Sequence, residues 1–158
     1  MPERRLAAGD HAPEFTLRDQ HGEAVSLSDF RGRTVVLFVY PQAMTPACTT
    51  EACEFRDSTA DFARAGIEVL GISPDDVDKL ARFAERDGLD YPLLSDPEHA
   101  MLEPYGAWGE KQNYGRTYVG VIRSTFVVGP DGVLLHALYN VKATGHVGRV
   151  RKLLLPAA

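Results

Sequence analysis

Long apolar runs, clusters of basic residues and cysteines are all scarce in this 158-residue chain. The N-terminal residues include two arginines but no apolar core behind them, and no later stretch is long enough to cross a bilayer, so we expect neither a secretory signal nor a membrane span. The net charge is −5 and the basic residues are scattered, which argues against nucleic acid or an anionic membrane surface as a partner.

Two cysteines are too few for a disulfide scaffold. We therefore expect a cytoplasmic protein in which both thiols are reduced at rest. If the thiols have a function, we expect it to depend on their reactivity. Hydrophobic residues make up 44% of the chain, which is enough for the core of one domain over residues 1–158.

The middle of the chain alternates between strand and helix patterns. Runs of β-branched and aromatic residues at 34–40 and 67–73 predict strands buried on both faces. Helical spacing follows each run, from Cys48 through Arg64 and from Ser73 to about Gly88. This order predicts an α/β domain with parallel strand pairing.

The flanking segments carry shorter signals. Alternating residues over 9–27 and 124–139 predict two hairpins, and the 124–139 signal is the stronger. A short strand from Tyr91 is expected to lead into a helix that ends near Gly106, and 106–118 has the composition of a surface loop. The last helix is expected over 145–155, with its inward face formed by Val147, Val150, Leu153 and Leu154.

Both cysteines lie at the junction between the first buried strand and its helix. Thr45 followed by Pro46 is typical of a helix start, with Thr45 as N-cap and Pro46 as the first helical residue. Cys48 is then the third helical residue, where unpaired N–H groups and the helix dipole favour negative charge. We expect this thiol to ionise more readily than a free one.

The two cysteines have three other interpretations. Free cysteines are often small buried apolar residues with no chemistry, so Cys48 and Cys53 could be inert. A structural metal site is poorly supported, because no Cys-x-x-Cys pair or histidine cluster completes four ligands. A thioredoxin-type dithiol needs two intervening residues, and here there are four.

The five-residue spacing limits how the cysteines can bond. On an ideal helix it separates their Cα atoms by about 8.7 Å, whereas a disulfide needs less than about 7 Å. We therefore predict that the reduced form keeps an intact helix and that a Cys48–Cys53 disulfide requires local melting between them.

The motif Pro41-x-x-x-Thr45-x-x-Cys48 resembles that of the peroxiredoxins. The longer string Tyr40-Pro41-x-x-Met44-Thr45-Pro46-x-Cys48-Thr49-x-Glu51-x-Cys53-x-Phe55-Arg56-Asp57 is similar to the bacterioferritin comigratory protein group, also called peroxiredoxin Q. Further marks are Gly71-x-Ser73-x-Asp75, Tyr91-Pro92-Leu93-Leu94-Ser95-Asp96, Tyr105-Gly106-x-Trp108 and Arg123-Ser124-Thr125-Phe126, so the likeness covers nearly the whole chain. The sequence departs from the common form at Gln42-Ala43 and Ala47.

The resemblance implies a thioredoxin-like α/β fold of the peroxiredoxin type, with a central mixed sheet flanked by helices and an N-terminal hairpin. It implies a thiol peroxidase in which Cys48 attacks hydrogen peroxide or an alkyl hydroperoxide and Cys53 resolves the product to a disulfide. Thr45, Pro41 and Arg123 would complete the site. The reductant would be thioredoxin or a similar dithiol protein, with no metal, flavin or haem, and we expect a monomer.

Each residue also has a simpler interpretation. Arg123 could be a solvated residue before a strand, Thr45 only a helix cap and Pro41 only a strand terminator. Glu51 is one turn from Cys48 and is expected to face solvent, with a role as catalytic base the less favoured alternative. Trp108 and Tyr114 are expected to pack rather than to cover the site, and none of the five histidines, His11, His21, His99, His136 and His146, is assigned chemistry.

Two other functions remain open. A redox sensor or adaptor would use the Cys48–Cys53 disulfide to change a binding surface, with slow oxidation and no need for rapid recycling. A thioredoxin-like disulfide exchanger would reduce protein disulfides without peroxide, but the chain has no Cys-x-x-Cys motif.

Overall fold

The structure, a computed structural model, describes residues 5–113 and 115–155. Its elements in chain order are β1 (Thr16–Arg18), β2 (Ala24–Ser26), the 3₁₀ helix η1 (Leu27–Phe30), β3 (Thr34–Val39), α1 (Pro46–Arg64), β4 (Ile67–Ser73), α2 (Val77–Asp87), β5 (Leu93–Ser95), β6 (Trp108–Asn113), β7 (Arg116–Val121), β8 (Ser124–Val128), β9 (Leu134–Leu138) and α3 (His146–Leu154). The two buried strands, both expected hairpins and the helices after β3 and β4 lie where the sequence predicts them.

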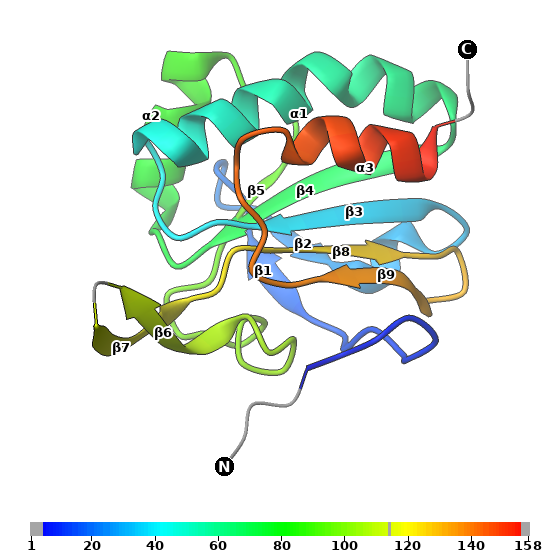
Figure 1. Cartoon of the computed structure of the whole chain (residues 1–158). Helices are drawn as coiled ribbons and strands as arrows, with labels where there is room; N and C mark the ends of the chain where they lie inside the picture. The colour runs from blue at the N-terminus through cyan, green and yellow to red at the C-terminus, as the bar shows by residue number, and fades with distance from the viewer. Residues whose placement is uncertain (1–4, 114, 156–158) are drawn as a thin grey trace.

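Seven strands form one mixed sheet in the order β2-β1-β5-β4-β3-β8-β9 (Figure 1). β3 pairs in parallel with β4, and β4 with β5, which confirms the expected parallel core. β8 runs antiparallel to β3, and its first residue, Ser124, lies opposite Val39. The segment just before β8 therefore lies at the carboxyl end of β3. The segment that carries both cysteines begins at the same place.

The sheet separates two hydrophobic cores. Val36 and Phe38 of β3 face one core together with buried residues of α1, α2 and α3. Val35 and Leu37 face the other, which is covered by the N-terminal segment and residues 101–107. In Figure 1 the long helix α1 and the shorter α3 lie over the same side of the sheet, with the N-terminal segment on the opposite side.

The ends of the helices follow local chemistry. Pro46 begins α1, and Gly66 with φ 76° follows its last turn, as a left-handed residue after a helix end should. The carboxylate of Asp76 accepts the N–H of Lys79 at 2.8 Å and caps α2, which ends at Gly88 in the left-handed region with φ 63°. The sequence signals for both helices are confirmed.

The helix expected before Gly106 does not form. The Asp96 carboxylate accepts the N–H groups of Ala100, Met101 and Leu102, and the segment continues as a series of turns. His99 has φ 61°, which an α-helix cannot accommodate. These turns do not form a continuous helix, but their buried side chains pack into the core that Val35 and Leu37 face.

The surface loop expected over 106–118 is also wrong, because β6 and β7 form a separate antiparallel hairpin there. Its strands pair only with each other, so neither shows the apolar pattern of a strand in the main sheet. Trp108 stacks on His99 with ring centroids 3.7 Å apart, which agrees with its expected packing role. Tyr114 lies outside the described residues.

One residue of α3 differs from expectation. Leu153 was expected to face inward but is 44% exposed. His146, to which no chemistry was assigned, is buried beside Val147. The His146 Nε2 and the hydroxyl of Thr125 are 2.7 Å apart, which satisfies the ring in the core. Among the described residues no helix is long and apolar enough to cross a membrane.

Candidate active site

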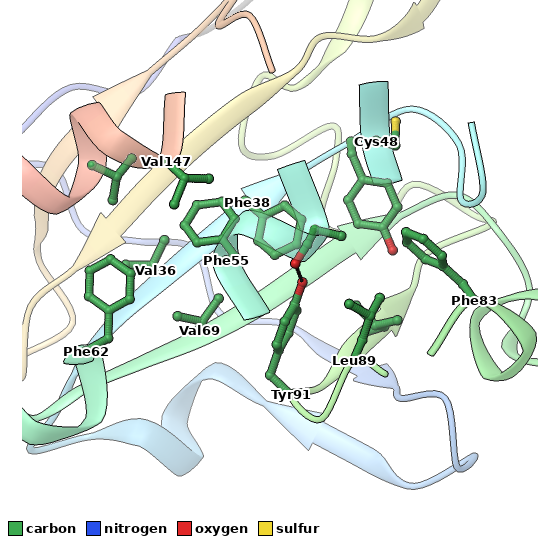
Figure 2. Packing of buried hydrophobic residues seen from close by; sticks show 14 of the residues in the cluster. Val36, Phe38, Cys48, Phe55, Phe62, Val69, Phe83, Leu89, Tyr91 and Val147 are labelled. Carbon is green, nitrogen blue, oxygen red and sulfur yellow. Dashed lines mark hydrogen bonds between the residues drawn. The ribbon is translucent and has the colours of Figure 1, made fainter. Parts of the chain in front are cut away.

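The turn after β3 aims the start of α1 into the protein. Pro41 follows the end of β3 and is half-buried, and Met44 adopts a left-handed φ of 67°. Thr45 is extended before Pro46 begins the helix. Cys48 is the third residue of α1 and is only 1% exposed. Figure 2 shows Cys48 at the margin of the aromatic core that contains Phe38, Phe55 and Phe83.

Arg123 reaches Cys48 from the segment just before β8. Its Nη2 lies 3.2 Å from the Cys48 sulfur, and its Nη1 donates to Glu51 Oε1 at 2.5 Å. The side chain of Arg123 is 13% exposed, so the interpretation as a solvated residue is wrong. A fixed guanidinium beside a buried thiol stabilises the thiolate, which is the nucleophilic form of cysteine.

Glu51 is the main residue that sequence reasoning misplaced. It was expected to face solvent, but it is fully buried and bonded to Arg123. Burial raises the pKa of Glu51 to about 7, Arg123 opposes this rise, and Glu54 adds to it. The available signal was helical spacing, because residues 48, 51, 55, 58 and 62 form one continuous face of α1, and all are buried.

Thr45 occupies the N-cap position, but its side chain does not cap the helix. Its hydroxyl instead donates to the carbonyl oxygen of Gln42 at 2.8 Å, across the turn before α1. The oxygen keeps lone pairs that can accept another hydrogen bond. The side chain thus braces the turn beside Cys48, and the expected capping bond is absent.

Asp75 ties this turn to the neighbouring parallel strand. Its Oδ2 accepts the N–H of Ala43 at 2.7 Å and the hydroxyl of Ser73 at 2.8 Å, and its Oδ1 lies 3.2 Å from Lys79 Nζ. The end of β4 therefore fixes the turn that precedes Cys48. The string Gly71-x-Ser73-x-Asp75 was noted in the sequence, but no local pattern indicated this contact.

Cys53 lies farther along the same helix. Both cysteines are free thiols, and α1 is continuous across them, as predicted for the reduced form. Cys53 is half-buried, and burial raises the pKa of its thiol, partly offset by the neighbouring Arg56. Cys48 and Cys53 thus have different surroundings, with the guanidinium of Arg123 beside Cys48 alone.

The part of α1 between the cysteines is held from outside the helix. The hydroxyl of Tyr91 donates to the carbonyl of Ala52 at 2.7 Å, a bond drawn in Figure 2. Arg86 Nη2 donates to the hydroxyl of Thr49 at 2.9 Å. In the described residues no group of three or more His, Cys, Asp and Glu side chains is placed to hold a metal.

Comparison with known proteins places the chain in a family. The model of the AhpC/TSA family matches residues 8–137. The chain belongs to this family.

Curated relatives narrow the assignment. A protein of Mycobacterium tuberculosis (strain H37Rv) named as a peroxiredoxin is 57% identical over 148 residues, covering 94% of each chain. Peroxiredoxin Bcp of Escherichia coli (strain K12) is 48% identical over 141 residues, covering 89% of this chain and 90% of its own.

Solved structures agree with the fold. Xanthomonas campestris peroxiredoxin Q superposes with a TM-score of 0.84 at 34% identity and 89% coverage of both chains. The expected resemblance to the peroxiredoxin Q group and the thioredoxin-like fold are both confirmed. The chain is an enzyme of the peroxidase class of oxidoreductases.

Proposed function

We propose that the chain reduces hydrogen peroxide and organic hydroperoxides with Cys48 as the nucleophile. The Cys48 thiolate attacks one oxygen of the peroxide, an S–O bond forms and the O–O bond breaks, which leaves a sulfenic acid on Cys48. The departing oxygen takes up a proton and leaves as water or an alcohol. The observation that carries this proposal is the Arg123 guanidinium 3.2 Å from the buried Cys48 sulfur.

The other site residues have roles that their positions support. Arg123 would stabilise the thiolate and hold the peroxide as charge builds on the leaving oxygen. The Thr45 hydroxyl oxygen would accept the O–H of the peroxide, and the Cys48 N–H would donate to a peroxide oxygen. Pro41, which lacks an N–H group and is rigid, would shape the pocket and shield the thiolate from water.

The catalytic cycle would close through Cys53. Once α1 has locally unwound, the Cys53 thiol condenses with the Cys48 sulfenic acid, a disulfide forms, and water leaves. A thioredoxin-like dithiol protein would then reduce the disulfide by thiol exchange. One domain over residues 1–158, a monomeric state and a cytoplasmic location remain predictions.

Two single variants test the assignment of the cysteines. Cys48→Ser should abolish peroxide-dependent oxidation of thioredoxin, because serine is not ionised at neutral pH. Cys53→Ser should reduce one equivalent of peroxide per chain and then stop, and mapping by mass should find the Cys48–Cys53 disulfide only in the oxidised wild type. Full peroxidase activity of Cys48→Ser would overturn the proposal.

A redox sensor is the second candidate, because both cysteines lie on one helix that must change shape on oxidation. Turnover separates the two functions. A peroxidase recycles rapidly with thioredoxin and its reductase, whereas a sensor would be oxidised and then recover slowly.

A further inference from the structure

Two buried acidic groups at the site share one positive charge. Cys48 is 1% exposed, Glu51 is fully buried, and Arg123 lies between them, with one guanidinium nitrogen on each partner. Two of the three can carry negative charge, and only one carries positive charge. Ionising both acids would leave an uncompensated charge in the core, which is costly.

Glu51 also has a place for a proton. Its Oε1 accepts the bond from Arg123, while its Oε2 is buried and has no hydrogen-bond partner among the described residues. An ionised carboxylate oxygen without a partner in the core is unfavourable. A proton on Oε2 would remove that charge and leave the bond between Oε1 and Arg123 in place.

Cys48, Glu51 and Arg123 form a triad, and its other neighbours do not neutralise its charges. The charged groups that act on Glu51 are Arg123 before β8 and Glu54 on α1, and Glu51 in turn acts on Tyr40 after β3 and Tyr91 before β5. Cys48 is linked to Glu51 through the guanidinium of Arg123, which both side chains contact. Burial raises the pKa of both tyrosines far above neutrality, so they stay uncharged. Glu54 is half-buried and negative, so it disfavours a second charge on Glu51.

We propose that Glu51 is a positioning residue that shares one proton with Cys48, so that the thiol and the carboxyl are not both ionised near neutral pH. In one state Glu51 is a carboxylate paired with Arg123, and Cys48 is a thiol. In the other, the thiol proton has moved to Oε2, and the charge of Arg123 is available to the Cys48 thiolate. The proton is conserved, and the net charge of the triad is zero in both states.

This inference rests on the proposed role of the Cys48 thiolate and adds to it. A carboxyl group whose pKa is raised to about 7 changes protonation near neutrality, which is the range that such an exchange requires. The two acids should therefore titrate as a coupled pair, with two macroscopic steps that belong to both groups. Glu51 would hold Arg123 in place while limiting how much of its charge reaches the sulfur.

The test uses Cys53→Ser chains, so that Cys48 is the only cysteine whose ionisation changes the ultraviolet absorbance. Glu51→Gln keeps the length of the side chain and an oxygen acceptor for Arg123 but removes the acid. We expect its thiolate to form in one step, at a pH about one unit lower than in the parent. Glu54→Gln, which removes a negative charge from the same helix without a bond to Arg123, should shift the titration by less than about 0.3 unit.

A second measurement follows the proton itself. Infrared difference spectra of the parent near neutral pH, with and without alkylation of Cys48, should contain a protonated-carboxyl band that changes on alkylation and is absent in Glu51→Gln. Circular dichroism and urea unfolding identify a variant that misfolds, and Glu51→Asp then provides a second acid variant that should restore two-step titration.

An unchanged or higher titration midpoint in folded Glu51→Gln would overturn the inference, as would the absence of a carboxyl band. Neither measurement uses peroxide. A chain that fails as a peroxidase but shows the coupled titration would refute only the proposed function.

Discussion

Replacing Tyr91 with phenylalanine removes one hydroxyl, and with it the bond to the carbonyl of Ala52 in α1 at 2.7 Å. The ring itself should stay, because it packs edge-on against Phe38 with centroids 5.8 Å apart. Ala52 lies between Cys48 and Cys53, in the stretch that must unwind for a disulfide to form. The substitution therefore weakens the closed helix without altering either thiol.

The size of the effect follows from the net value of one buried hydrogen bond, about 1 kcal/mol. The Ala52 carbonyl also accepts the regular helical bond from the residue four positions later, so loss of the hydroxyl does not leave it unpaired. Because about 1.4 kcal/mol is a tenfold change in an equilibrium constant, the unwound population should rise about fivefold.

Two assays measure this change. Amide exchange across residues 46–55 of the reduced protein should speed up about fivefold in Tyr91→Phe. After one equivalent of peroxide, the conversion of sulfenic Cys48 to the disulfide should accelerate by a similar factor, and less sulfinic acid should form at high peroxide. The first reaction with peroxide should keep its rate, since the closed helix still dominates.

Tyr105→Phe is the matched control. Its hydroxyl also donates to a backbone carbonyl, that of Pro13, at 2.7 Å, but it lies in the core on the other side of the sheet. It should lose similar global stability and keep the wild-type rate of disulfide formation. Equal rates in Tyr91→Phe and Tyr105→Phe would refute the idea that the Tyr91 bond restrains unwinding.

Two further predictions concern stability. A Cβ at Gly71 would lie 2.9 Å from the Phe38 ring, so Gly71→Ala should lower the free energy of unfolding by about 1–3 kcal/mol in urea. Gly120→Ala, with no neighbour closer than 3.6 Å, should change it by less than about 1 kcal/mol. Burial lowers the pKa of His146 to about 4, and the nearby charges of Arg149 and Arg123 add to this effect. Below about pH 6.5 the unfolded chain therefore binds a proton at this residue that the folded chain does not bind. Wild type should therefore lose about 2 kcal/mol more than His146→Gln between pH 7 and pH 5 in urea titrations, and equal losses would contradict this reasoning.

The strand and helix at the centre of the fold could be predicted because their signals are local. The apolar run of β3 and the Thr45-Pro46 helix start lie within a few residues of what they determine. The turns after Asp96 could not, because one carboxylate that accepts three N–H groups replaces the expected helix. The hairpin β6–β7 was missed because its strands have no apolar face buried in the main sheet.

The site residues also differ in whether their own neighbourhood in the sequence predicts them. Cys48 at the helix start is a local inference, but Arg123 is 75 residues away, and only the resemblance pointed to it. Glu51 was misjudged because a charged residue on a helix usually faces water, and its buried partner comes from outside the helix. Helical spacing placed Glu51 on the buried face of α1, but no pattern in either segment pointed to Arg123 as its partner.

The Asp75 carboxylate divides the segment around Cys48 into a fixed part and a moving part. Ala43 is anchored to the end of β4 through Asp75, so we expect the chain before it to keep its position when the helix unwinds. The pivot then lies between Ala43 and Cys48, a stretch that already contains Met44 in the left-handed region. Cys48 would move outward by rotation about this stretch, while Pro41 and Arg123 keep their positions. The pocket would therefore keep its shape until the thiol returns.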